Sequence, residues 1–243
     1  MNDRSVMSLA GPEVQDLKEE TTVLDRMLRF DGARVLELGC GAAEKTQLIV
    51  EQTAVTEIVA AEVDAVQHEK NLAMTGLDRI TFKSYGAESI QEPDASFDIV
   101  LMFKSLHHVP TENMEAALRE IYRVLKPGGH AYISEPVFAG AFNDVMRVFH
   151  DEEVVRRNAF ETVKRVIADR LFDLREEYFF RNRLRLESWE QYEQNVINVT
   201  HTDHSLEPTQ LAEVKQRFDA HESPEGFVFE IPNRVDLLEK VQQ

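Results

Sequence analysis

A short apolar strand that breaks into glycines and restarts as a helix constrains the fold of this chain more than any other feature. Residues 35–46 read Val-Leu-Glu-Leu-Gly-Cys-Gly-Ala-Ala-Glu-Lys-Thr. Gly39 and Gly41 lack Cβ atoms, so the backbone can turn sharply and approach a ligand closely, and the helix that follows offers unpaired N–H groups at its start. The stretch therefore predicts a cofactor-binding loop between a strand and a helix.

Strand and helix signals alternate on both sides of this loop. The run at 97–103, Phe-Asp-Ile-Val-Leu-Met-Phe, is apolar and continuous, as expected for a central parallel strand covered on both faces. Five βα units in succession imply a doubly wound parallel sheet that binds ligands at the carboxyl ends of its strands. The patterns predict helices at 12–30, 43–51, 66–74 and 113–125, and strands at 34–38, 56–63, 80–83, 97–103 and 130–134.

The alternation stops after the fifth strand. Residues 142–192 have helical patterning with few breakers, which predicts a helical insertion, and a helix at 209–218 with strands at 227–231 and 234–238 is expected to complete a mostly parallel, seven-stranded α/β sheet. We expect one domain with four parts: an N-terminal cap helix (1–30), a cofactor-binding core (31–136), a helical lid (137–206), and a closing helix and strands (207–243).

The charge and composition of the chain exclude several classes of partner. A net charge of −17 opposes binding to nucleic acids and anionic membranes, because neutralising phosphates requires basic side chains. No apolar run approaches the roughly 18 residues that a membrane span needs. The single cysteine, Cys40, cannot form an intramolecular disulfide, and the first residues lack a basic and then apolar leader, so a cytoplasmic location is expected.

Two ligand classes use a strand, a glycine loop and a helix, followed roughly 20 to 25 residues later by an acidic residue: dinucleotides and S-adenosylmethionine. A dinucleotide places its pyrophosphate at the helix N-terminus, where this chain has Glu44 in place of the third glycine. Glu37 adds further negative charge at the loop entrance. S-Adenosylmethionine carries an ammonium and a sulfonium, so these carboxylates favour it, whereas Glu62 suits the ribose hydroxyls of either class.

The chain at this point resembles the class I, Rossmann-like S-adenosylmethionine-dependent methyltransferase family. The resemblance covers residues 34–136, and its five pieces come in the order and spacing of the family. These pieces are the loop at 35–43, Glu62, the stretch 86–98 ending in Ser-Phe-Asp, Leu-His-His-Val at 106–109, and Leu-Lys-Pro-Gly-Gly at 125–129.

The resemblance implies a set of cofactor contacts. The loop would line the methionine end of the cofactor, Glu62 would hold the ribose, Ala87 would meet the adenine through its backbone, and Phe103 with Leu106 would flank the cofactor. By position, the implied cofactor-binding residues are Glu37, Gly39, Cys40, Gly41, Glu62, Val63, Ala87, Glu88, Phe103 and Leu106.

Two positions depart from the family pattern. The last loop glycine of the family is Ala43 here, a small change that preserves close approach. The frequent aspartate for the adenine amino group falls at Gly86, which has no side chain, so either Glu88 substitutes for it or backbone and water do.

His107 and His108 follow the fourth strand, at the rim where a methyl acceptor would lie. A histidine can accept a proton at cellular pH, so one of them is a candidate general base, and the alternative is that they pack and fix the loop. Transfer from a sulfonium is an in-line displacement for which positioning can suffice. Cys40, between two glycines, is interpreted as a packing residue and not as a nucleophile.

The acceptor is expected to be a small molecule. The chain has Phe-Lys-Ser-Leu at 103–106, where nucleic-acid and protein amine methylases of this fold often show Asn/Asp-Pro-Pro-aromatic. The insertion is the candidate specificity element. Its arginines, Arg156, Arg157, Arg181 and Arg183, suit an anionic acceptor, a solvated helix face or a homodimer surface, and its aromatics, Tyr178, Phe179, Phe180, Trp189 and Tyr192, suit an acceptor pocket or a core.

The sequence therefore predicts an S-adenosylmethionine-dependent methyltransferase with a small, anionic or aromatic acceptor. The alternatives are a non-catalytic S-adenosylmethionine-binding partner or regulatory subunit, and a methylase of a protein or RNA. No metal site is predicted, because the His-x-x-His pair of His201 and His204 has no further Cys or His around it.

Overall fold

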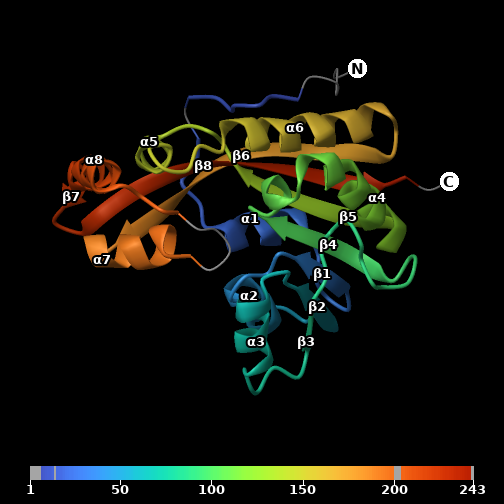
Figure 1. The fold of residues 1–243 in the computed structure, drawn as a ribbon. Helices are drawn as coiled ribbons and strands as arrows, with labels where there is room; N and C mark the ends of the chain where they lie inside the picture. Colours follow the sequence, from blue (N-terminus) through green and yellow to red (C-terminus); the bar gives the residue numbers. More distant parts are fainter. Residues whose placement is uncertain (1–6, 14, 200–203, 242–243) are drawn as a thin grey trace.

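A computed structural model describes residues 7–13, 15–199 and 204–241. Its centre is one sheet in the order β3-β2-β1-β4-β5-β8-β6, and the two-residue β7 pairs only with β8 (Figure 1). Neighbouring strands from β3 to β5 are parallel, and β8 runs antiparallel to β5 and β6. The predicted doubly wound, mostly parallel sheet is confirmed. The strands are β1 (Arg34–Leu38), β2 (Glu57–Ala61), β3 (Ile80–Lys83), β4 (Phe97–Phe103), β5 (Leu125–Pro136), β6 (Phe172–Leu186), β7 (Glu222–Ser223) and β8 (Gly226–Lys240).

Successive strand residues point to opposite faces of the sheet. Because both faces carry apolar side chains, helices cover both of them. Leu36, Val100 and Ile133 share one apolar cluster with α4 and α6, and their neighbours Val35 and Ile99 share another with α1 and α2. The α-helices are α1 (Glu20–Met27), α2 (Glu44–Gln52), α3 (Ala65–Leu72), α4 (Met114–Val124), α5 (Ala141–Met146), α6 (Glu153–Ala168), α7 (Trp189–Tyr192) and α8 (Pro208–Asp219). In the described residues, none of these helices has the length and apolar character needed to cross a membrane.

A smaller apolar cluster lies at one end of the two long strands β6 and β8. Tyr192, Phe218 and Phe229 are buried there, and α5, α7 and α8 supply the side chains around them. Figure 1 shows these helices gathered near β7. They form a cap beyond the part of the sheet that holds β1 to β3.

The predicted helix at 12–30 is wrong in its first half, since α1 begins only at Glu20. The backbone before it pairs with the exposed edge of β6: the Lys18 N–H donates to the Arg181 carbonyl, and the Arg181 N–H donates to the Asp16 carbonyl, both at 2.8 Å. An edge strand leaves backbone groups unpaired, and this pairing satisfies them. Tertiary contacts at residues 16–18 therefore take the place of the predicted helix there, and Val14 lies outside the described residues.

The helical prediction for 142–192 is also wrong over part of its length. Helices α5 and α6 follow β5 as expected, but residues 172–186 form the strand β6. Phe172, Leu174, Tyr178 and Phe180 recur at every second or fourth position, and most residues between them are charged. This alternation is typical of a strand with one buried face. The large number of Arg and Glu residues makes the pattern hard to recognise in the sequence.

The two closing strands predicted at 227–231 and 234–238 are one continuous strand, β8. Pro232 lies inside it, opposite Arg181 of β6. The N–H and carbonyl of Arg181 form hydrogen bonds with Asp16 and Lys18. The pairing of β6 with β8 therefore needs no N–H from Pro232 at this position. Proline therefore does not end the strand.

Candidate active site

The glycine loop lies between β1 and α2, at the carboxyl edge of the sheet. Its first two N–H groups, those of Gly39 and Cys40, donate to the Ala61 carbonyl at 2.9 and 3.0 Å. Gly39 has φ +73°, and a Cβ there would lie 2.7 Å from the Ser105 Cβ, so only glycine fits. The loop is thereby held against the ends of both β2 and β4.

The carboxylate of Glu62 fixes the other side of the loop. It accepts hydrogen bonds from the Gly41 N–H at 2.8 Å and from the Asp64 N–H at 2.9 Å. Glu62 is 8% exposed, and each of its oxygens keeps a second lone pair. The carboxylate can therefore still accept a hydroxyl hydrogen from a ligand in the neighbouring cleft.

A cleft of about 620 Å³ opens above this loop. Seven of the ten predicted cofactor-binding residues line it: Gly39, Gly41, Glu62, Val63, Ala87, Glu88 and Phe103. The Glu88 carboxylate lies 2.4 Å from the position that a Cβ on Gly86 would take. Glu88 therefore occupies the space of the side chain that Gly86 lacks.

Three predicted residues do not line this cleft. Glu37 lies under the loop, 2% exposed, where its carboxylate accepts the Thr46 hydroxyl at 2.5 Å. Cys40 packs in a small cluster with Ala43 and Ala60, and burial raises the pKa of its thiol. Leu106 is fully buried in the core cluster that includes α4. The structure thus places all three behind the cleft wall.

Burial also controls the ionisation of Glu37. It raises the pKa of Glu37 to about 7, and nearby Glu62 adds to the shift, whereas Thr46 and Lys45 oppose it. The negative charge that the sequence suggested at the loop entrance is therefore only partly present at neutral pH.

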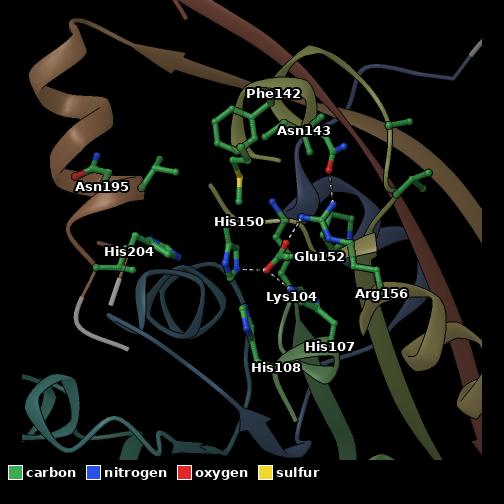
Figure 2. Close-up of a pocket in the computed structure, with 17 residues that line it drawn as sticks. Lys104, His107, His108, Phe142, Asn143, His150, Glu152, Arg156, Asn195 and His204 are labelled. Atoms are coloured by element: carbon green, nitrogen blue, oxygen red, sulfur yellow. Dashed lines mark hydrogen bonds and ion pairs between the residues drawn. The ribbon is translucent and has the colours of Figure 1, made fainter. Parts of the chain in front are cut away.

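A second cavity, of about 250 Å³, lies beside the cleft and under the cap helices. His107, His108, His150 and His204 all line it, together with Glu152. Figure 2 shows side chains converging on Glu152, whose Oε1 lies 2.9 Å from His150 Nε2 and 3.6 Å from His107 Nε2, while Arg156 pairs with Oε2. The cavity is therefore lined by basic groups around one carboxylate.

His107 is held between two carboxylates. Its Nδ1 makes a short contact with Glu135, and its Nε2 faces Glu152. Burial alone would lower the pKa of His107, but Glu135 and Glu152 outweigh it and raise the pKa to about 9. The pKa values of Glu135 and Glu152 are lowered in turn, since the cationic ring outweighs their own burial. His108 is exposed and stacks beside His107, with ring centres 4.1 Å apart.

Lys104 lies where the two cavities meet. It follows β4 directly, has φ +54°, and lines both cavities, as His108 does. Burial lowers the pKa of Lys104. Among the residues that the structure describes, its ammonium has no hydrogen-bond or ion-pair partner. Strained backbone and unpaired buried charge are both concentrated at functional sites in proteins, so Lys104 is a candidate functional residue.

The sequence patterns do not predict three residues of this site: Lys104, Glu135 and Glu152. Lys104 and Glu135 had a signal, because Lys104 directly follows β4, as Glu62 follows β2, and Glu135 directly follows the strand predicted at 130–134. Glu152 had no such signal in the sequence, since it lies in the stretch that was expected to be helical throughout.

The structure places only some of the predicted acceptor residues of the insertion at the second cavity. Arg156 lines the second cavity, whereas Arg157, Arg181 and Arg183 pair with surface carboxylates. None of the five predicted aromatic residues lines the cavity. Phe142, which is not one of these five, does line it. His204 lines the cavity, and His201 lies outside the described residues.

Comparisons with known proteins give a family match for the central part of the chain. Residues 35–129 match the family described as a methyltransferase domain. The 27-O-demethylrifamycin SV methyltransferase of Amycolatopsis mediterranei is 32% identical over 56% of this chain and 54% of its own length. The chain spans about half the length of the first curated relatives that it matches.

Solved structures share the fold over most of the chain. The YcgJ protein of Bacillus subtilis has a TM-score of 0.63 at 16% identity, covering 92% of this chain and 97% of that one. SpnF, named a [4+2]-cyclase, has a TM-score of 0.57 at 20% identity, covering 92% of this chain and 80% of that one. The fold thus extends beyond the matched domain to the cap and the antiparallel strands.

Proposed function

We propose that the protein transfers a methyl group from S-adenosylmethionine to a small-molecule acceptor, because residues 35–129 match the methyltransferase domain family and lie within a Rossmann-like sheet. The observation that supports this best is the meeting of the two cavities. Lys104 and His108 line both the cleft above the glycine loop and the cavity under the cap. An in-line displacement needs donor and acceptor in adjacent sites that share an opening.

The cofactor fits the larger cleft. Glu62 would accept the ribose hydroxyls, and Glu88, folded over Gly86, would accept the adenine amino group. Glycine at 39 and 41 lets the methionine end approach the loop backbone. Carboxylates at 62, 64 and 88 around the cleft suit a donor that carries an ammonium and a sulfonium.

The smaller cavity fits the acceptor. His108 is exposed and lines both cavities, so it is the candidate general base where the acceptor atom carries a proton. Both ring nitrogens of His107 face carboxylates, which suits it to fix the geometry of the acceptor end.

An anionic acceptor is favoured over a purely aromatic one. Lys104 and Arg156 line the cavity, and the predicted aromatic residues pack elsewhere: Tyr178 and Phe180 against the α1 face of the sheet, and Trp189 and Tyr192 in the cap cluster. A carboxylate, phosphate or ionised hydroxyl would pair with the Lys104 ammonium.

Titration calorimetry with S-adenosylmethionine and with NAD tests the cofactor, and tighter binding of NAD would overturn the proposal. Incubation with S-adenosylmethionine and a panel of small acids and phenols, followed by mass spectrometry for a gain of one methyl group, tests the transfer. S-Adenosylhomocysteine should form in step with the methylated product.

The second candidate is a protein that binds the cofactor without transferring its methyl group. The fold neighbour SpnF is named a cyclase, so this fold does not by itself establish methyl transfer. Tight S-adenosylmethionine binding with no methylated product would favour this candidate. Salt-sensitive binding of a macromolecule would instead favour a protein or RNA acceptor. The dimer surface and the cytoplasmic location stay predictions of the sequence.

A further inference from the structure

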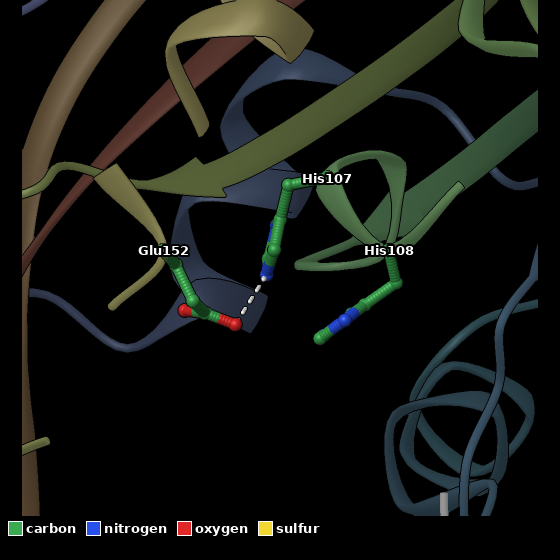
Figure 3. Close-up of side chains that lie close together, drawn as sticks. All are labelled: His107, His108 and Glu152. Atoms are coloured by element: carbon green, nitrogen blue, oxygen red, sulfur yellow. Dashed lines mark ion pairs between the residues drawn. The ribbon is translucent and has the colours of Figure 1, made fainter. Parts of the chain in front are cut away.

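His107, His108 and Glu152 form a cluster that neither the loop motif nor the cofactor cleft explains. Each offers one ligand atom, and these three atoms all lie within 4.8 Å of one another. Figure 3 shows the two imidazoles and the carboxylate facing a common space. The residues come from two separate elements, the turn after β4 and the segment before α6, so the fold alone brings them together.

We propose that His107, His108 and Glu152 bind a divalent transition-metal ion at the acceptor end of the site. Two imidazoles and one carboxylate are the donor set that zinc and iron(II) sites use while leaving coordination positions open. The ion would displace the proton on Nε2 of His107, because only a neutral imidazole nitrogen binds a metal. Bonds of about 2.0 to 2.2 Å would bring the ligand atoms to about 3 to 3.5 Å from each other. The exposed side chain of His108 can make this adjustment by rotation.

The surroundings of the cluster suit metal binding. Glu135 contacts Nδ1 of His107, which fixes the ring and directs Nε2 at the cluster, and Glu135 is itself held by the Leu106 N–H at 3.0 Å. A carboxylate behind a ligating histidine is the usual supporting contact in metal sites. Arg156 holds Oε2 of Glu152 and leaves Oε1 for the ion.

His150 is a candidate fourth ligand. Its Nε2 lies 2.9 Å from Glu152 Oε1, the same oxygen that faces His107. The cavity of about 250 Å³ leaves room beside the cluster for an acceptor group. A cation there would bind an acceptor oxygen and lower its pKa, which is a general action of metal ions in catalysis. With the ion bound, His108 is a ligand, and the cation takes over its proposed role of preparing the acceptor for loss of its proton.

The test uses tag-free full-length protein, treated with a chelator and dialysed. Calorimetry with Zn²⁺ should give one saturable site per chain, and Co²⁺ should give a visible absorption spectrum of a nitrogen-ligated ion. His108→Ala and Glu152→Gln each remove a ligand and should weaken Zn²⁺ binding by more than about 100-fold, and Glu135→Gln, behind His107, should weaken it about 10- to 100-fold. His221→Ala, at a histidine outside both cavities, should bind Zn²⁺ as the unaltered protein does.

Absence of a saturable site in the unaltered protein would overturn the proposal, and so would equal binding by all the cluster variants. His108 is exposed, so its variant should fold, and thermal melting checks this. The measurement needs no S-adenosylmethionine. Failure to bind Zn²⁺ therefore leaves the methyltransferase proposal standing, and failure to bind the cofactor leaves the metal site standing.

Discussion

The backbone N–H of Gly41 donates to the Glu62 carboxylate at 2.8 Å, and this bond joins the glycine loop after β1 to the end of β2. The same carboxylate accepts the Asp64 N–H at 2.9 Å, just before α3 begins. One side chain therefore sets the shape of the loop and faces the cleft at the same time. The two roles can be separated by experiment.

Glu62→Ala should weaken S-adenosylmethionine binding by about 1 to 3 kcal/mol, because backbone donors and ligand hydroxyls lose their acceptor. Glu62→Gln keeps one acceptor oxygen and should lose less. Calorimetry measures both, and Glu69→Ala, an exposed glutamate on α3, is the matched control. Unchanged affinity in Glu62→Ala would remove Glu62 from the cofactor site.

His108→Ala should lower turnover about 100-fold where the acceptor carries a proton, since general bases contribute at least this much. S-Adenosylmethionine affinity should change little, because most of the cleft is formed by other residues. Steady-state kinetics and calorimetry on the same preparation separate the two effects. His221→Ala is the control, and a normal rate in His108→Ala would assign His108 to structure.

His107→Ala should also lower turnover, because His107 lines the acceptor cavity and not the cofactor cleft. The substitution should also lower the free energy of unfolding, since it leaves Glu135 buried without its cationic partner. Removing one member of a buried ion pair costs about 3 to 5 kcal/mol of unfolding free energy. Urea denaturation should show this loss, and calorimetry should show nearly unchanged cofactor affinity. Full stability would contradict the buried pair.

The parallel half of the sheet could be predicted from the sequence because its signals are local. Each strand from β1 to β4 is a short, mostly apolar run, and Gly39 and Gly41 mark the break between β1 and α2. The parallel direction of these strands follows from successive βα units. Predicted strand bounds agree with the structure to the residue at β3 and β4.

The antiparallel half could not be predicted in the same way. Tyr178 of β6 pairs with Val235 of β8, far along the chain, and no local signal specifies such a partner. The cavity under the cap depends on the same long-range packing, which brings Glu152, just before α6, against His107, just after β4. Local sequence therefore predicted seven residues that line the cleft above the glycine loop, whereas it did not predict His150 or Glu152 in the cavity under the cap.

Lys104→Met should lower turnover of an anionic acceptor and raise the free energy of unfolding. Methionine keeps the length of the side chain and the strained backbone, so only the unpaired, partly buried charge is removed. Such changes at active sites commonly add about 0.5 to 2 kcal/mol of stability. Lys104→Arg should retain part of the activity, and Lys70→Met, at an exposed lysine on α3, should change neither quantity.

The Michaelis constants for the acceptor and for S-adenosylmethionine show which of these two molecules the Lys104 ammonium binds. Loss of acceptor affinity with unchanged S-adenosylmethionine affinity is expected. The reverse pattern would show that Lys104 binds the cofactor carboxylate, and it would contradict the assignment to the acceptor.

Glu37 should make the protein less stable as the pH rises from 5 to 8. Burial raises the pKa of Glu37 from 4.5 to about 7, so between these values the folded protein holds a proton that the unfolded chain has released. The unfolded chain then binds fewer protons than the folded one, and unfolding becomes easier as the pH rises through this window. At about 1.4 kcal/mol per pKa unit, the full loss is on the order of 3 kcal/mol.

Glu37→Gln tests this, because glutamine resembles the protonated acid and can still accept the Thr46 hydroxyl. Urea denaturation should give similar stability for both proteins at pH 5, and the variant should be more stable by about 3 kcal/mol at pH 8. Other groups titrate in the same range, including His107, so the difference between the two proteins is the informative quantity. Parallel pH curves for the two proteins would show that Glu37 ionises at its ordinary pKa, and the loop would then carry its full negative charge at neutral pH.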